Sequence, residues 1–224
     1  AIYANNRYEF SISNQAPFIR LDHYGNYDNA LGIAIQKSLE FIRFYRIKSL
    51  AKTDSDELGG LVSPDGRNLV AQVYASKELR QLITAYFVPY GLQLVIKPHE
   101  HKFEVQKHAD GVVIGFPFHL ISDTLQRIIF YAVAIDSNKE STLVFEEPEA
   151  HAFPYYTKHL GERIALDENK NQYFIATHNP YLLTSIWEKS TRGDVAVFAT
   201  HYRNYETRVK LLTPEDMTWL FEAD

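Results

Sequence analysis

The stretch LVFEEPEAHAFP, residues 143–154, is the part of the sequence that decides the fold. A short apolar run ends abruptly in Glu146, Glu147 and Glu149, and His151 follows two residues later. Three carboxylates within four residues repel one another, and ionised carboxylates are costly to place beside a core. Such a group is therefore expected to serve a ligand at the end of a buried strand.

A second apolar strand, expected at 172–177, ends in Thr177 and His178. In open parallel sheets, ligands bind outside the carboxyl ends of the strands. The separation of Glu147 and His178, 178 − 147 = 31 residues, is about the length of one strand–helix–strand unit, so both are expected at one edge. Carboxylates suit Mg²⁺ and can orient a water, and histidine can meet a phosphate oxygen. This combination indicates phosphoryl transfer.

The rest of the chain predicts an α/β fold, with a mostly parallel sheet flanked by helices and a smaller α+β part at the N-terminus. Strands are expected at 7–13, 43–50, 142–146, 172–177, 194–199 and 205–212. Helices are expected at 26–42, 68–87 (with Asn68 as its cap), 122–137, 154–166, 180–187 and 214–223. Residues 91–118 predict two or three strands, with a turn at 109–111.

The expected division is an N-terminal segment, 1–60, and a larger C-terminal lobe, 61–224. Within the lobe, a helical part at about 61–135 precedes a part at about 140–224 that carries the two motifs. The 224 residues, 46% of them hydrophobic and 23% charged, are typical of a globular protein with a large core.

Charge and cysteine content exclude several classes of function. The formal net charge of −5 gives no general attraction to nucleic acid or anionic membrane. The absence of cysteine excludes disulfides and thiolate metal sites and fits a cytoplasmic location. No apolar run is long enough to span a bilayer, and no secretory leader is expected.

Taken together, EEPEAH at 146–151 and ATHNP at 176–180 resemble the ABC-type ATPase family, and within it the SMC/RecF-like branch. Members of that branch carry an apolar strand ending in the form D-E-P-E-A-H and a later strand ending in T-H-S/N-P. The resemblance covers roughly residues 55 to 200. It implies an ATPase that uses ATP and Mg²⁺ and works as a dimer.

The resemblance also implies a role for each motif residue. Glu147 would polarise the attacking water, and His178 would sense the γ-phosphate as the switch histidine. Glu146 takes the place of the Walker B aspartate, which holds Mg²⁺ through water, with an arm that is longer by one methylene. The segment 148–151 resembles the approach to the D-loop, which touches the opposite subunit.

Ser122, Asp123 and Thr124 stand where the family carries its signature motif, although the usual glycine is absent. A helix N-terminus offers free N–H groups and a positive dipole end, which suit the γ-phosphate of a nucleotide held by another subunit. The alternative is that these residues simply cap the helix.

The sequence contains no G-x-x-x-x-G-K-[ST] loop to cradle phosphates. Gly60 and Gly66 are one residue too far apart, and Arg67 follows them. We therefore expect this chain to be the C-terminal portion of an ATPase whose phosphate loop comes from an upstream lobe or a second chain. The chain alone is not expected to hydrolyse ATP efficiently.

Two other functions remain open at this point. A metal-dependent nuclease would use Glu146, Glu147 and Glu149 directly, although no further acidic cluster follows His178. A non-catalytic assembly module would need none of them.

Two other clusters have alternative interpretations. His99, His101 and His108 indicate either a metal site or, more simply, an exposed hairpin. In the segment 43–48, Arg43, Arg46 and Lys48 with Phe44 and Tyr45 indicate either a nucleic-acid contact or, more simply, a solvated strand face.

Overall fold

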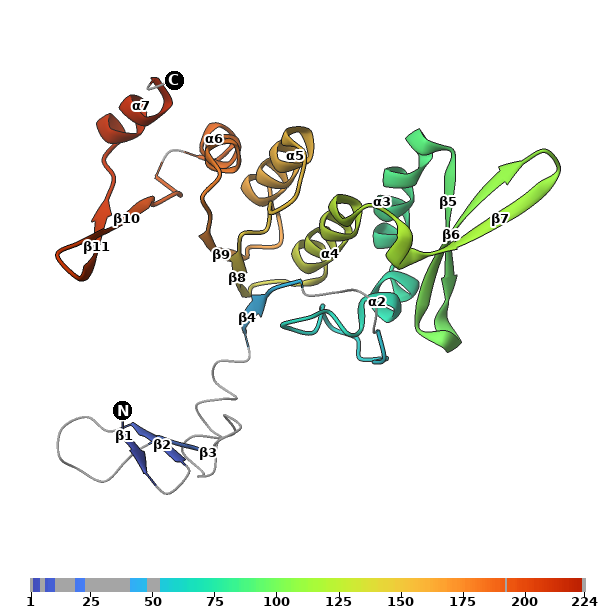
Figure 1. Cartoon of the computed structure of the whole chain (residues 1–224), viewed down its shortest axis with the longest axis horizontal. Helices are drawn as coiled ribbons and strands as arrows, with labels where there is room; N and C mark the ends of the chain where they lie inside the picture. Colours follow the sequence, from blue (N-terminus) through green and yellow to red (C-terminus); the bar gives the residue numbers. More distant parts are fainter. Residues whose placement is uncertain are drawn as a thin grey trace.

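The computed structural model describes residues 2–4, 7–10, 19–22, 41–47, 53–191 and 193–222 (Figure 1). At its centre is a three-stranded sheet in the order β4 (Ile42–Tyr45), β8 (Thr142–Glu146) and β9 (Gln172–Ala176). Both pairs of strands are parallel. The sequence predicts the pairing of β8 with β9, whereas β4 comes from the segment expected to form a separate N-terminal part. The carboxyl ends of all three strands consequently share one edge.

One face of this sheet is covered by helices. Figure 1 shows α4 (Asp123–Ser137), α5 (Pro154–Ala165) and α6 (Pro180–Lys189) on the same side of the strands. The alternation of β8 turns Leu143 and Phe145 toward this side, where both are almost fully buried. The predicted fold class, a parallel sheet flanked by helices, is confirmed.

Among the described residues, the opposite face of the same sheet is apolar and exposed. Ile42, Phe44 and Phe174, which alternate with the inward-facing residues, are 42%, 41% and 56% exposed. Parallel sheets in other proteins are covered on both faces. Within the described residues, β9 also pairs with β8 alone, so its outer edge offers unpaired backbone groups.

The expected helix over 68–87 is two helices, α2 (Leu69–Ala75) and α3 (Lys77–Phe87). Ser76 between them is extended, and its hydroxyl accepts a hydrogen bond from the Leu79 N–H, which caps α3. A serine that can bond its local backbone favours a cap over a helix interior, which explains the break.

Asn68 precedes α2, but the prediction that its side chain caps this helix is wrong. Its Oδ1 accepts instead from the Val62 N–H at 2.7 Å, and its amide donates to the Glu57 and Gly60 carbonyls. Asn68 is fully buried and holds the glycine-rich turn that precedes α2.

An antiparallel sheet projects beside α2 and α3, formed by β5 (Leu92–Lys97), β6 (Lys102–Ala109) and β7 (Val112–Pro117). The turn predicted at 109–111 is present, and its residues Asp110 and Gly111 both have positive φ. The three strands predicted as the upper limit are thus all formed.

The strand expected at 194–199 is wrong in position and in partner. The observed strand, β10 (Phe198–Arg203), pairs antiparallel with β11 (Glu206–Leu211) in a separate sheet, and α7 (Pro214–Glu222) follows. Only Asn204 and Tyr205 connect the two strands, and both have positive φ. Closing a two-residue hairpin is a local event, and the local pairing prevails over insertion into the parallel sheet.

At the N-terminus, β1 (Ile2–Ala4), β2 (Arg7–Phe10) and β3 (Ile19–Asp22) form a small antiparallel sheet. The prediction of a strand at 7–13 is confirmed for β2. The helix predicted at 26–42 lies outside the described residues for all but its last two positions, which belong to a turn and to β4.

The close packing of α5 against α6 depends on Gly161. A Cβ at this position would meet the Ser185 Cβ at 2.6 Å and the Leu182 carbonyl oxygen at 3.2 Å. We predict that Gly161→Ala lowers the free energy of unfolding by about 1–2 kcal/mol, because overpacking outweighs the gain of about 1 kcal/mol in helix propensity. Denaturant unfolding measures the change.

Gly115→Ala is the matched control, because a Cβ at Gly115 on β7 meets no atom within 4 Å. It should change stability by less than about 0.5 kcal/mol. An equal stability of the two variants would contradict the packing argument.

Candidate functional site

The carboxyl edge of the parallel sheet brings Glu147 and His178 together. Glu147 directly follows β8, and its N–H donates to the Ala176 carbonyl at the end of β9 at 2.8 Å. The Glu147 Oε1 atom then lies 3.6 Å from the His178 Nε2 atom. The two residues that the spacing argument placed at one edge are therefore neighbours across the two strands.

Both side chains are open to solvent and to a ligand. The Glu147 side chain is 52% exposed and that of His178 is 92% exposed. Glu147 has a φ of +43°, a left-handed conformation that is costly for a residue with a Cβ. Backbone strain of this kind persists where the surrounding structure holds it, here through the bond to Ala176.

Glu146, the last residue of β8, faces a cation that the sequence analysis did not include in the site. Its Oε2 atom lies 3.4 Å from an Nη1 atom of Arg46, which follows β4, and both side chains are about half exposed. The rule that polar groups gather at the carboxyl ends of parallel strands would have found Arg46 as well. Each of the three strands thus contributes an ionisable side chain to this edge, namely Arg46, Glu146 and His178.

Glu149 does not share the exposure of the other two glutamates. Only 5% of the residue is exposed, and its Oε1 accepts a hydrogen bond from the Thr177 hydroxyl. The metal-dependent nuclease would need this carboxylate beside Glu146 and Glu147, and its burial counts against that function. Within the described ranges, no cluster of three or more histidine, aspartate or glutamate residues has the geometry of a metal site.

Ser122, Asp123 and Thr124 lie at the start of α4, and each makes an internal contact. The Ser122 hydroxyl accepts from the Leu125 N–H at 3.3 Å, as a helix cap does. Asp123 pairs with Arg127, whose Nε is 2.9 Å from the Asp123 Oδ2. The capping interpretation is therefore realised in the structure, while a contact of these residues with nucleotide remains a prediction.

Thr124 links α4 to the segment that follows the glutamates. Its hydroxyl donates to the His151 carbonyl at 2.8 Å. His151 has a φ of +61°, so the chain bends sharply here before α5. The signature-like residues and the D-loop-like segment are thus joined by a direct hydrogen bond.

Beneath this edge lies the buried side chain of Tyr131 on α4, which is 1% exposed. Burial raises the pKa of Tyr131 to about 12, opposed by the Arg127 charge and reinforced by the Glu149 and Glu146 carboxylates. The phenol therefore remains protonated at neutral pH.

Among the described residues, the histidines of segment 99–108 do not form a metal site. His99 and His101 lie in a turn between β5 and β6, not on one strand, and His108 on β6 contacts the Gln93 amide oxygen at 3.1 Å. This is the exposed hairpin that the sequence favours.

The interpretation of segment 43–48 as a solvated face is wrong for Arg43 and Tyr45. Arg43 and Tyr45 turn inward, and both donate to the Leu61 carbonyl. Phe44 faces outward, on the open face of the sheet. Lys48 lies outside the described residues.

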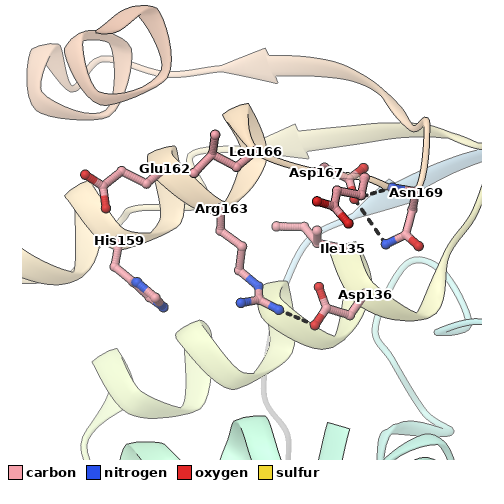
Figure 2. Close-up of a pocket in the computed structure, with 9 residues that line it drawn as sticks. Ile135, Asp136, His159, Glu162, Arg163, Leu166, Asp167 and Asn169 are labelled. Atoms are coloured by element: carbon pink, nitrogen blue, oxygen red, sulfur yellow. Dashed lines mark hydrogen bonds and ion pairs between the residues drawn. The ribbon is translucent and has the colours of Figure 1, made fainter. Parts of the chain in front are cut away.

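A cavity of about 460 Å³ lies between the C-terminal ends of α4 and α5, at the opposite end of the strands (Figure 2). Asp136 and Arg163 form an ion pair there, and burial raises the pKa of Asp136 while Arg163 opposes the shift. Three further acids line the cavity, namely Glu162, Asp167 and Glu168. Its excess of negative charge is unsuited to phosphate.

A family model described as "AAA domain, putative AbiEii toxin, Type IV TA system" matches residues 14–184, about three quarters of the chain. The chain therefore belongs to this family of AAA ATPases. No protein with a curated description matches the sequence.

Solved structures of SMC head domains share the fold. The SMC head bound to the C-terminal winged helix domain of ScpA aligns over 89% of this chain and 68% of its own, with a TM-score of 0.52 and 10% identity. An SMC ATPase described by its ATP-driven dimerization and DNA stimulated activation aligns over 67% and 93%, with a TM-score of 0.46 and 15% identity. The Smc head of Pyrococcus furiosus with an extended coiled coil aligns over 65% and 37%, with a TM-score of 0.42 and 14% identity.

The first of these likenesses, with a TM-score of 0.52, shows the fold of an SMC-type head. The family match shows an AAA ATPase domain. None of the described helices has both the length and the apolar character that a bilayer crossing needs.

The position of His178 depends on the start of α6. Asn179 caps this helix, since its Oδ1 accepts from the Tyr181 and Leu182 N–H groups at 2.9 and 3.3 Å. We predict that Asn179→Ala lowers the free energy of unfolding by about 1 kcal/mol. Asn179→Asp should retain most of the capping stabilisation, because a carboxylate also caps a helix N-terminus. Denaturation midpoints test this; an equal loss in both variants would contradict the capping role.

Proposed function

We propose that this chain supplies the Walker B and switch half of an ATP-hydrolysing site that works in a dimer. The observation that carries the proposal is the pairing of Glu147 with His178 beside Glu146, at the edge where three parallel strands end. The family match to an AAA domain supports ATP as the nucleotide.

In this proposal, Glu147 orients and polarises the water that attacks the γ-phosphate. A carboxylate that is half exposed and 3.6 Å from an imidazole can accept a proton from water and hold its direction. His178, exposed beside it, would meet a γ-phosphate oxygen. The two side chains reach the same solvent-facing volume, as a water and the phosphate that it attacks require.

Glu146 would hold Mg²⁺, and its surroundings fit that ion. Mg²⁺ is bound through one or two carboxylates together with phosphates and water, rather than by a cage of protein ligands. Glu146 is exposed at the strand end, and its described charge partner is a single half-exposed arginine, Arg46. When bound, the ion would neutralise charge on the phosphates.

The phosphate loop would come from an upstream lobe or another chain. The sequence contains no such loop, and an AAA domain needs one to wrap the phosphates. The open apolar face of the sheet, formed by Ile42, Phe44 and Phe174, and the unpaired edge of β9 offer that lobe a docking surface. Without it, we expect this chain to hydrolyse ATP poorly.

Dimerisation would place α4 of one subunit against the nucleotide of the other. Ser122 and Asp123 are exposed at the helix N-terminus, and Thr124 ties them to the D-loop-like segment. This arrangement supports the proposed contact in trans, in which the helix dipole favours the γ-phosphate.

The test of the catalytic role is Glu147→Gln in the complete native assembly that contains this chain. We expect the rate of Mg²⁺-dependent ATP hydrolysis to fall by about 10²- to 10⁴-fold, because an amide is a poor base, while ATP binding persists. Trapped nucleotide and an accumulated dimer should follow. Glu188→Gln, at an exposed position of α6, is the matched control and should retain the wild-type rate.

Other outcomes distinguish the alternatives. Wild-type ATP hydrolysis that Glu147→Gln leaves intact would refute the catalytic role. Cleavage of nucleic acid with Mg²⁺ or Mn²⁺ and without ATP would instead support the nuclease. Full biological function in the Glu147→Gln protein would support the assembly module.

The docking surface predicts a second result. If the phosphate-loop lobe covers the open face, Phe174→Asp buries a charge and should lower the stability of the native assembly by about 3 kcal/mol or more. Leu58→Asp, at a loop position that is 65% exposed, should change it by less than about 0.5 kcal/mol. Thermal denaturation compares them; equal midpoints would show that Phe174 remains exposed.

A further inference from the structure

Glu149 is withdrawn from solvent in a way that packing does not explain. The residue is 5% exposed, and its Oε1 accepts a hydrogen bond from the Thr177 hydroxyl. Its Oε2 is also buried and accepts no hydrogen bond from the described part of the protein. A buried carboxylate with unused acceptor capacity is unfavourable for stability, which points to a role beyond packing.

The Thr177 hydroxyl connects Glu149 to the far side of His178. Its oxygen accepts a second hydrogen bond, from the Asn179 N–H at 3.0 Å. A hydroxyl donates one hydrogen bond and accepts others, so donation to Glu149 turns its lone pairs toward Asn179. The relay from Glu149 through Thr177 to Asn179 therefore spans the backbone of His178.

Hydrogen bonds fix the backbone on either side of His178, whereas its side chain is largely exposed to solvent. Before it, the Ala176 carbonyl accepts from the Glu147 N–H at 2.8 Å, and after it, Asn179 caps α6. The His178 side chain is 92% exposed and 3.6 Å from Glu147. With so little packing around the ring, its location depends mainly on the backbone from which it projects.

We propose that Glu149 is a positioning residue for His178. Through Thr177 it fixes the backbone at 177–179, and it thereby keeps the imidazole within reach of Glu147. The inference rests on the proposed function, in which His178 meets the γ-phosphate, and adds a residue that touches neither nucleotide nor metal. Buried Glu149, which follows β8, thus holds the loop after β9 through its hydrogen bond with Thr177.

The first test measures order around His178 in the native protein without nucleotide. Thr177→Val keeps the side-chain shape but removes the relay, and amide hydrogen exchange at Asn179 should become about three- to ten-fold faster, the factor that corresponds to one neutral hydrogen bond. Thr177→Ser restores the hydroxyl and should restore slow exchange. Unchanged exchange in Thr177→Val would overturn the inference.

Thr184→Val is the matched control, because the Thr184 hydroxyl donates to the Pro180 carbonyl within α6 and lies outside the relay. It should leave exchange at Asn179 unchanged.

A double variant separates positioning from a purely structural role. Thr177→Val leaves Glu149 buried without a donor, whereas Glu149→Leu combined with Thr177→Val replaces both partners by apolar groups of similar shape. The double variant should therefore melt at or above the temperature of the single variant, yet keep fast exchange at Asn179. A lower melting temperature would show that Glu149 acts in packing, and would overturn the inference.

Turnover provides the functional readout. Thr177→Val should lower the kcat of ATP hydrolysis by about ten-fold in the wild-type protein but by less than about two-fold in a His178→Ala background, because a residue that acts through His178 has no further effect once it is gone. An equal fold-decrease in kcat from Thr177→Val in both backgrounds would overturn the inference.

Using both hydrogen exchange and ATP turnover also separates this inference from the proposed function. If the wild-type assembly does not hydrolyse ATP, the proposed function fails, and hydrogen exchange alone decides the positioning role. Faster exchange in Thr177→Val would then support the relay, and unchanged exchange would overturn it.

Discussion

The parallel pairing of β8 with β9 is the constraint on which the site depends. In its register Glu146 lies opposite Ala176, so the residues that follow each strand leave the sheet at the same level. The Glu147 N–H extends this ladder by one bond, to the Ala176 carbonyl. A shift of one residue would turn every side chain of the strand to the other face, so the buried Leu143 and Phe145 also secure the place of the acidic residues.

Two features of the site lower local stability but hold its residues in position. Glu147 adopts a left-handed backbone conformation, and Glu149 buries a carboxylate of which one oxygen is unpartnered in the described protein. Both features lie within three residues of the strand end, and both contact the loop that carries His178. Backbone strain and buried polar groups concentrate at functional sites when the surrounding structure over-determines them, as the hydrophobic core beneath β8 does here.

Among the described residues, helices cover only one side of the sheet. Its helix-covered face holds Tyr45 against Phe130 and Phe145 in edge-on aromatic contacts, whereas Phe44 and Phe174 on the other face are exposed. An apolar sheet face that the described residues leave exposed is suited to docking by another segment or chain. The proposed second lobe would account for this exposed face and for the missing phosphate loop, because it would cover the one and supply the other.

The sequence by itself determined the parallel strands at 142–146 and 172–177, their helices, and the convergence of Glu147 with His178, because strong periodicity and the strand-end rule are local signals. Tertiary structure decided what depends on contacts between distant segments. It paired Arg46 with Glu146, buried Glu149 against Thr177 and turned Arg43 inward. The sequence does not distinguish an exposed glutamate such as Glu147 from a buried one such as Glu149. Burial and hydrogen-bond partners depend on the packing of distant segments, which only the tertiary structure decides.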